Sequence, residues 1–141
     1  MERTLIILKP DSVKRGLEKK IVKRYEKAGL KQIARKELSA SVALLRTHYS
    51  AHVGKPFYPN LEKFMASGTV VAIIFEGSDA VATARRVTGA TKPLEAEEGT
   101  VRGDFRDASL AGEDAVTKNM VHASATKEEA EKEIKLWFGK L

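Results

Sequence analysis

Apolar and polar positions follow different periods along the chain, and these periods predict where its strands lie. Leu5 to Leu8 forms a short apolar run that predicts a buried strand. Val70 to Phe75 is apolar at every position, so this strand is expected to be central in its sheet. The weak alternation from Gln32 to Leu38 is typical of a half-buried strand, and Asn119 to His122 predicts a short further one.

Between the strands, apolar residues recur with the spacing of amphipathic helices. The first such segment runs from Leu17 to Leu30, and Gly29 lies where the helix should stop. Asp79 can cap a later helix. Three more helices are predicted between the first and the last, over residues 42–49, 60–66 and 79–88.

The last predicted helix begins at Thr126-Lys127-Glu128-Glu129, a sequence that matches a capping box. In a capping box the first side chain accepts a hydrogen bond from the backbone of the fourth residue, which fixes the start of the helix. Its buried stripe is expected to consist of Ala130, Ile134, Trp137 and Phe138.

The order of elements predicts the fold class. Gly89 to about Lys118 shows little periodicity, and so long a loop in a small domain is usually functional. The order β-α-β-α-β-α-loop-β-α matches an α+β fold of the ferredoxin-like, split βαβ type. We therefore predict one domain over residues 1–141, with a four-stranded antiparallel sheet, helices on one face and a long loop before the last strand.

Composition narrows the classes of function without selecting one. The 25 Lys and Arg residues against 19 Asp and Glu give a net charge of +6, which suits an anionic partner such as nucleic acid, an acidic membrane or a phosphorylated small molecule. The absence of Cys excludes disulfides, thiolate metal sites and a thiol nucleophile. No stretch approaches the roughly 18 apolar residues of a membrane span, and the N-terminal apolar run is too short for a signal sequence. We expect a soluble cytoplasmic protein.

A phosphate site in this chain would have to be built from side chains. The common glycine-rich phosphate loops and the H-E-x-x-H metal motif are absent from the sequence. Lys9 ends the first strand and is fixed by the following proline, which makes it the strongest candidate. The other candidates are Arg85 and Arg86 on one helix and Arg102 in the long loop, although each alone is more commonly a solvated surface charge.

The chain has three histidines. His48 and His52 are four residues apart on a predicted helix and could bind a metal, but no third ligand is evident, so we interpret them as part of a polar helix face. His122 ends a predicted strand and precedes the small residues Ala123-Ser124-Ala125, which would leave room for a ligand. On this evidence alone, a structural histidine remains the commoner alternative.

Five blocks in register supply the missing context. They are Glu2-Arg3-Thr4-Leu5-Ile6-Ile7-Leu8-Lys9-Pro10-Asp11, Gly54-Lys55-Pro56-Phe57-Tyr58, Gly89-Ala90-Thr91-Lys92-Pro93, Gly99-Thr100-Val101-Arg102-Gly103-Asp104-Phe105 and Asn119-Met120-Val121-His122-Ala123-Ser124. Together they resemble the signature blocks of the nucleoside diphosphate kinase family, over essentially the whole chain.

The resemblance implies an activity and a set of site residues. It implies transfer of the γ-phosphoryl group of a nucleoside triphosphate, mainly ATP, to a nucleoside diphosphate through phosphorylated His122, by a ping-pong mechanism. Mg²⁺ would be carried by the nucleotide phosphates, with no protein ligands. Tyr58 would offer its ring face to any base, so broad base specificity is expected. The family's nucleotide contacts match Lys9, Tyr58, Arg85, Thr91, Arg102 and Asn119, and its supporting residues match Tyr49, Ser124 and Glu133.

The sequence also departs from the family pattern. The usual His-Gly-Ser-Asp-Ser is His122-Ala123-Ser124-Ala125-Thr126 here, and Tyr58 stands where Phe is usual. The segment from Phe105 to Lys118 is longer than in the common pattern. Counting back from His122 places Val116 where the family covers the base opposite the aromatic ring, with the charged residues of 107–114 in solvent.

The resemblance further implies a homo-oligomer built from dimers, and Pro93 favours a hexamer over a tetramer. Nucleoside tri- and diphosphates are the expected partners, without a membrane or a specific nucleic acid. Two alternatives remain open. One is a catalytically inactive regulatory relative. The other is a nucleic-acid-binding module on the same fold. Such a module needs aromatic residues on its strands, whereas the strands of this chain carry aliphatic ones.

Overall fold

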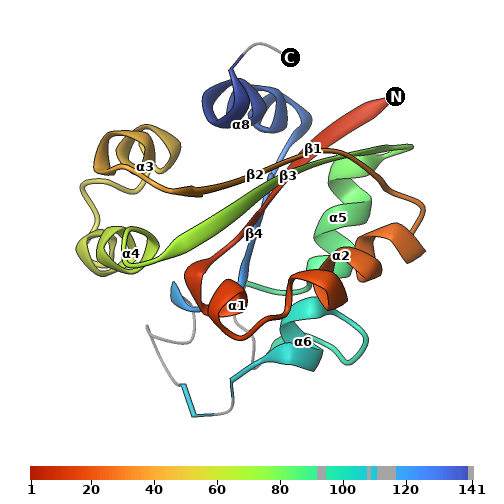
Figure 1. Cartoon of the computed structure of the whole chain (residues 1–141), viewed down its shortest axis with the longest axis horizontal. Helices are drawn as coiled ribbons and strands as arrows, with labels where there is room; N and C mark the ends of the chain where they lie inside the picture. Colours follow the sequence, from red (N-terminus) through yellow and green to blue (C-terminus); the bar gives the residue numbers. More distant parts are fainter. Residues whose placement is uncertain (92–94, 108, 111–116, 140–141) are drawn as a thin grey trace.

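The structure is a computed structural model that describes residues 1–91, 95–107, 109–110 and 117–139. Its elements are arranged as shown in Figure 1. In chain order they are β1 (Glu2–Leu8), α1 (Pro10–Lys14), α2 (Glu18–Lys27), β2 (Lys31–Ser39), α3 (Val42–His48), α4 (Tyr58–Met65), β3 (Thr69–Gly77), α5 (Ala80–Thr88), α6 (Val101–Phe105), β4 (Val121–Ala123) and α8 (Lys127–Phe138).

The four strands form one sheet in the order β2-β3-β1-β4, and every neighbouring pair is antiparallel. The predicted α+β fold with a four-stranded antiparallel sheet is confirmed, and β3 is central as expected. In the register of the sheet, Ile6 of β1 lies between Ile73 of β3 and Ala123 of β4. This pairing brings the C-terminal end of β1 beside β4.

Helices cover both faces of the sheet, so the prediction of helices on one face was wrong (Figure 1). Ile6 and Leu8 pack on one side into a core shared with α2 and α5. Leu5 and Ile7 pack on the other side into a core shared with α3, α4 and α8. The reason is already in β1 and β3, whose consecutive apolar residues point alternately to the two faces and need cover on both.

Helices α8 and α5 are capped at their starts in different ways. The Thr126 side chain accepts a hydrogen bond from the backbone N–H of Glu129 at 3.1 Å, which confirms the predicted start of α8. Asp79 occupies the N-cap position of α5, but its φ of 47° places its backbone in the left-handed region and its side chain makes no capping hydrogen bond. The carboxylate of Glu2 caps this helix instead, by accepting from the N–H of Val81 at 2.8 Å.

Hydrogen bonds tie the end of β1 to the approach of β4. The backbone N–H of Lys9 and the hydroxyl of Ser12 both donate to the carbonyl of Met120, at 2.9 Å each. Met120 has a φ of 74°, which is unusual for a residue with a side chain and turns the chain sharply just before β4. The turn holds Lys9 and His122 on the same end of the sheet.

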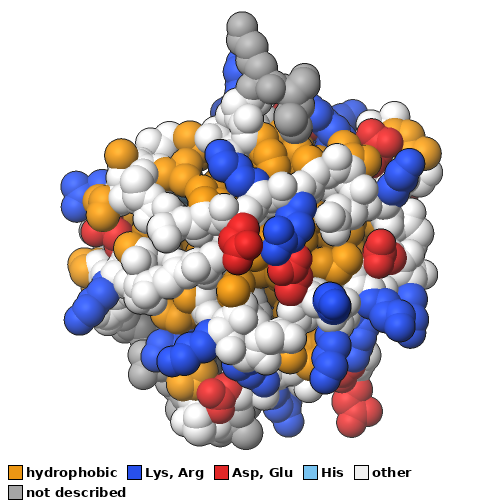
Figure 2. All heavy atoms as spheres, viewed as in Figure 1, with side chains coloured by type: hydrophobic (Ala, Val, Ile, Leu, Met, Phe, Trp, Pro, Cys, Tyr) orange, Lys and Arg blue, Asp and Glu red, His pale blue; other side chains and the backbone are white. Residues whose placement is uncertain are grey.

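Charged side chains of both signs are interspersed over the face drawn in Figure 2, with apolar groups between them. On this face the net positive charge is therefore dispersed and does not form one continuous basic stripe of the kind that tracks a nucleic-acid backbone. None of the helices in the described part of the chain has the length and apolar character needed to cross a membrane.

Candidate active site

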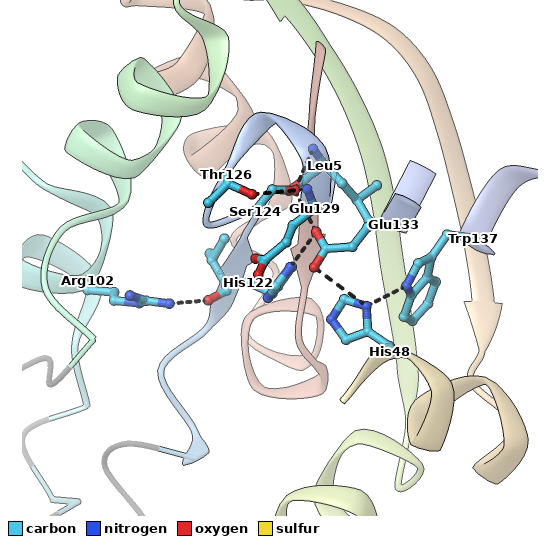
Figure 3. Close-up of polar contacts among 10 residues, drawn as sticks. Leu5, His48, Arg102, His122, Ser124, Thr126, Glu129, Glu133 and Trp137 are labelled. Atoms are coloured by element: carbon cyan, nitrogen blue, oxygen red, sulfur yellow. Dashed lines mark hydrogen bonds and ion pairs between the residues drawn. The ribbon is translucent and has the colours of Figure 1, made fainter. Parts of the chain in front are cut away.

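His122 lies in β4, where it pairs with Ile7 of β1. Its ring nitrogen Nε2 is 3.0 Å from Oε1 of Glu133 on α8 (Figure 3). The His122 side chain is 19% exposed, so the ring is held by the sheet yet remains accessible. Because one ring nitrogen is engaged by a carboxylate, the other, Nδ1, is left for chemistry.

Glu133 is itself fixed by a second donor. The hydroxyl of Ser124 donates to the same Oε1 at 2.6 Å, and the N–H of Leu5 donates to that hydroxyl at 3.2 Å. Burial alone would raise the pKa of Glu133, but the hydrogen bond and charge of His122 and the bond from Ser124 outweigh burial and lower it. Glu133 is therefore an ionised, immobile acceptor behind His122.

A cavity of about 360 Å³ opens on the other side of His122. Three cationic side chains line it: Lys9, Arg85 and Arg102. Among the described residues that line this cavity, no carboxylate opposes them. A concave site with several cations and no matching anion is suited to a phosphorylated ligand.

Within the described part of the chain, the hydrogen-bond partners of the two buried cations are backbone carbonyls. Arg102 donates to the carbonyls of Val121, Gly89 and Asn119 at 2.6, 3.2 and 3.4 Å. Lys9 Nζ is 3.3 Å from the carbonyl of Thr117. Burial, followed by the charge of Arg102, lowers the pKa of Lys9 to about 7, although nearby Asp11 acts in the opposite sense. Burial also lowers the pKa of Arg102 to about 10, which leaves it charged at neutral pH.

Three buried polar atoms of residues that line the cavity lack a partner within the described protein, and one of them is Nδ1 of His52. The Asn119 amide nitrogen donates to the carbonyl of Thr91 at 3.1 Å, and this bond fixes the orientation of the side chain. Its Oδ1, and the hydroxyl of Tyr49, are buried without a hydrogen bond. Asn119, Thr91 and Tyr49 all line the cavity, so a bound polar ligand could satisfy the Asn119 and Tyr49 atoms.

Comparisons with known proteins identify the family of this chain. A family model described as "Nucleoside diphosphate kinase" matches residues 2–141. The chain belongs to the nucleoside diphosphate kinase family. It is 48% identical over 141 residues to the nucleoside diphosphate kinase of Caldanaerobacter subterraneus subsp. tengcongensis, a match that covers 100% of this chain and 96% of that protein. By this membership the protein is an enzyme, a phosphotransferase.

Two solved structures are similar over the same length. The apo nucleoside diphosphate kinase of Encephalitozoon cuniculi has a TM-score of 0.91 at 41% identity and covers 99% of this chain and 90% of that one. The enzyme of Halobacterium salinarum, solved in complex with CDP, has a TM-score of 0.89 at 40% identity and covers 99% and 88%. Both comparisons support the ferredoxin-like fold.

The aromatic residue at the cavity of this kinase differs from the one predicted. Tyr58 is 3% exposed and packs in the core beside Tyr49, with its hydroxyl 3.2 Å from Glu62. Phe57, one residue earlier, is half-buried and lines the cavity. Tyr58 begins α4 on the same inward stripe as Leu61, and that it presents its ring to the base stays a prediction.

His48 was also misinterpreted from the sequence. Its side chain is 1% exposed, which excludes a polar helix face, and its ring lies 4.5 Å from that of His122. With Glu133 these two histidines form the metal-competent group found among the described residues, with ligand atoms within 4.8 Å of one another. His52 lines the cavity instead.

Two expectations fall on residues outside the described chain, namely the packing of Val116 over a base and the influence of Pro93 on assembly. From the same long segment, Arg106 and Asp107 are described and exposed, as expected for its charged part.

Proposed function

We propose that this kinase transfers the γ-phosphoryl group of a nucleoside triphosphate, mainly ATP, to a nucleoside diphosphate by a ping-pong mechanism through phosphorylated His122. One observation carries the proposal: a histidine with one nitrogen bound to a carboxylate lies at the wall of a cavity that is lined by cations and, in its described part, by no carboxylate. This arrangement suits a nucleophile that faces a phosphoanhydride.

In the first half-reaction, the lone pair of His122 Nδ1 attacks the γ-phosphorus, and the bond from phosphorus to the bridging oxygen of the β-phosphate breaks. The proton on Nε2 stays in place, 3.0 Å from Glu133, whose negative charge stabilises the positive ring that forms. The second half-reaction reverses these steps. A terminal oxygen of the acceptor diphosphate attacks the phosphorus, and the bond to Nδ1 breaks.

Positioning and neutralisation of charge would supply most of the rate. Lys9 and Arg102 are buried beside His122's cavity, and exposed Arg85 stands on α5 at its wall. The Tyr49 hydroxyl, which has no hydrogen-bond partner among the described residues, can donate to a phosphate oxygen. The described lining lacks the carboxylates that Mg²⁺ prefers, so it fits a metal already held by the nucleotide phosphates. There Mg²⁺ would neutralise phosphate charge.

The nucleoside would occupy the part of the cavity lined by Phe57 and Leu61. A ring face and an aliphatic side chain do not distinguish base edges, which supports broad base specificity. Asn119 Oδ1 can accept a hydrogen bond from a ribose hydroxyl. That the similar protein of Halobacterium salinarum was solved with CDP supports a nucleotide as the ligand.

The proposal is tested with γ-labelled ATP. The protein should acquire an acid-labile label on His122, and an unlabelled nucleoside diphosphate should discharge it. Initial rates at several fixed donor concentrations should give parallel double-reciprocal lines. A protein that binds ATP but takes up no label would be the inactive relative, and label retained in the presence of every diphosphate would contradict the second half-reaction.

The outer strand of the sheet bears on how copies of the chain assemble. The β2 strand is an outer strand of the sheet and exposes Ile33, which offers an edge for a second copy. We propose a homo-oligomer built from dimers, a hexamer in preference to a tetramer, in the cytoplasm. Light scattering during size-exclusion chromatography gives the mass, and a monomer would contradict the assembly.

A further inference from the structure

Behind His122, two residues that the transfer itself does not use are joined by a hydrogen bond. Trp137 of α8 donates from Nε1 to Nδ1 of His48, the last residue of α3, at 3.0 Å (Figure 3). An indole nitrogen can only donate, so His48 Nδ1 must carry a lone pair. A neutral His48 therefore has its proton on Nε2.

The surroundings keep this ring uncharged. Burial lowers the pKa of His48 to about 3, and the nearby charges of His122, Lys9 and His52 act in the same sense, against Glu133. Nδ1 of His48 is 4.0 Å from Oε2 of Glu133, but with a neutral ring this contact is no ion pair. The other charged groups at this side are Glu129, Lys132 and Lys135, which line the pocket behind the ring.

This tautomer has a consequence for Glu133. Oε1 of the carboxylate accepts from His122 and Ser124, whereas Oε2 faces the lone pair of His48. If Nδ1 of His48 carried a proton, His48 could donate to Oε2, and two imidazoles would share one carboxylate. The edge-on contact of His48 with His122, at 78° between rings, also restricts how far His122 can tilt.

We infer that Trp137 and His48 are positioning residues: Trp137 fixes the tautomer of His48, and His48 thereby does not compete with His122 for the Glu133 carboxylate. The inference rests on the proposed function of His122. It assigns no substrate contact to either residue, because neither lines the cationic cavity as far as the structure describes it.

A double-variant cycle separates this role from simple packing. Trp137→Phe keeps a ring in the core but removes the donor, so His48 is free to protonate Nδ1 and bind Oε2. Single-turnover phosphorylation of His122 should slow about tenfold, the scale of weakening one hydrogen bond to a charged group, with KM for ATP unchanged.

The decisive variant adds His48→Phe to Trp137→Phe. Phenylalanine keeps a ring against His122 but has no proton for Glu133, so the rate should return most of the way to that of the parent. If the two side chains only packed against each other, the losses of rate from the two substitutions would add up. A double variant no faster than Trp137→Phe therefore overturns the inference. Melting temperatures of all three variants show whether a slow rate reflects unfolding.

A measurement on the parent protein does not depend on variants or on catalysis. ¹⁵N chemical shifts of histidine-labelled protein should show His48 as the Nε2–H tautomer from pH 5 to 9, without titration. An Nδ1–H tautomer, or a midpoint within that range, overturns the inference. Failure of ATP to label the parent would overturn the proposed function separately and leave this tautomer assignment standing.

Discussion

The two sides of His122 differ in how far the protein satisfies its own polar groups. On the cavity side, Lys9 and Arg102 are buried with carbonyl partners alone, and Asn119 Oδ1 has none in the described structure. On the rear side, Glu133 has two hydrogen-bond donors and His48 has its own. The difference indicates that the protein itself orients the polar groups on the rear side, whereas those on the cavity side are left to pair with a ligand. Variants on the two sides should therefore fail in different ways.

The largest effect is expected at His122, where the two sides meet. His122→Ala should abolish the phosphoenzyme and ping-pong transfer, because the described cavity offers no other imidazole hydrogen-bonded to a carboxylate. Nucleotide binding should survive, since the cations are untouched. Phosphoenzyme assays and calorimetric titration with ADP measure the two properties. More than trace ping-pong activity in this variant would remove the basis of the mechanism.

Substitutions on the cavity side should weaken the stabilisation of the transition state. Lys9→Ala and Arg102→Ala should each raise the activation free energy of transfer by about 2–4 kcal/mol, the scale of one preorganised donor at a charged transition state. The loss should fall on kcat more than on KM. Arg86→Ala is the matched control, because Arg86 is exposed on α5 and does not line the described cavity. Losses confined to KM would show that the cations only hold the substrate.

Substitutions on the rear side should disturb the orientation of His122 and the charge behind it, and should leave nucleotide binding intact. Glu133→Gln keeps the size of the side chain but removes the negative charge opposite His122 Nε2. We expect kcat to fall by the equivalent of about 1.5–3 kcal/mol, the worth of a hydrogen bond to a charged group, at an unchanged KM. Steady-state kinetics with several diphosphates give both constants. An increase in KM as large as the fall in kcat would place Glu133 on the substrate side.

The buried charge of Lys9 on the cavity side should also lower the free energy of unfolding of the protein without a ligand. The pKa of Lys9 is about 7 in the folded chain against 10.5 as its ordinary value, so the unfolded chain binds more protons between these pH values. The free energy of unfolding should therefore rise with pH across that window through Lys9. Lys9→Met should raise it by about 1–2 kcal/mol at pH 7, because it removes a buried charge without a bound counterion.

Denaturant titrations at pH 6.5 and 9 measure this effect. The difference between Lys9→Met and the parent should be smaller at pH 9 than at pH 6.5, since the parent loses the buried charge as pH rises. Phosphate or ADP should stabilise the parent more than the variant. A variant less stable than the parent at both pH values would show that the Lys9 charge is compensated in the empty protein.

What the sequence predicts and what it misses have physical reasons. The apolar run of β3 and the capping box of α8 are local signals, so the central strand and the last helix are confirmed. The sequence predicts the start of α4 at residue 60, two positions late, whereas the base contact was assigned to Tyr58 from the family resemblance and stays a prediction. With α4 beginning at Tyr58, the residues on its inward stripe are Tyr58, Leu61 and Met65.

His48 was missed for a similar reason. It follows Leu45 by three residues and therefore shares the buried face of α3, but a polar residue type favoured a solvent-facing interpretation. Its partner, Trp137, lies 89 positions later, and no local pattern connects them. The cavity side could be predicted from charges and from the family resemblance, whereas the rear depends on contacts between distant helices.

The smallest effect concerns Phe57 and Tyr58, the adjacent aromatic residues at the start of α4. Matched substitutions decide which of the two contacts the base. Phe57→Leu and Tyr58→Leu make the same ring-to-aliphatic change at adjacent positions. Because Phe57 lines the cavity, its loss should raise KM for every nucleoside diphosphate by the equivalent of about 0.5–1.5 kcal/mol, the worth of an aromatic contact beyond burial. Because Tyr58 is buried beside Tyr49, its loss should lower the melting temperature and leave KM unchanged. Kinetics at a temperature where both variants are folded give the comparison. A higher KM in Tyr58→Leu alone would restore the base contact to Tyr58.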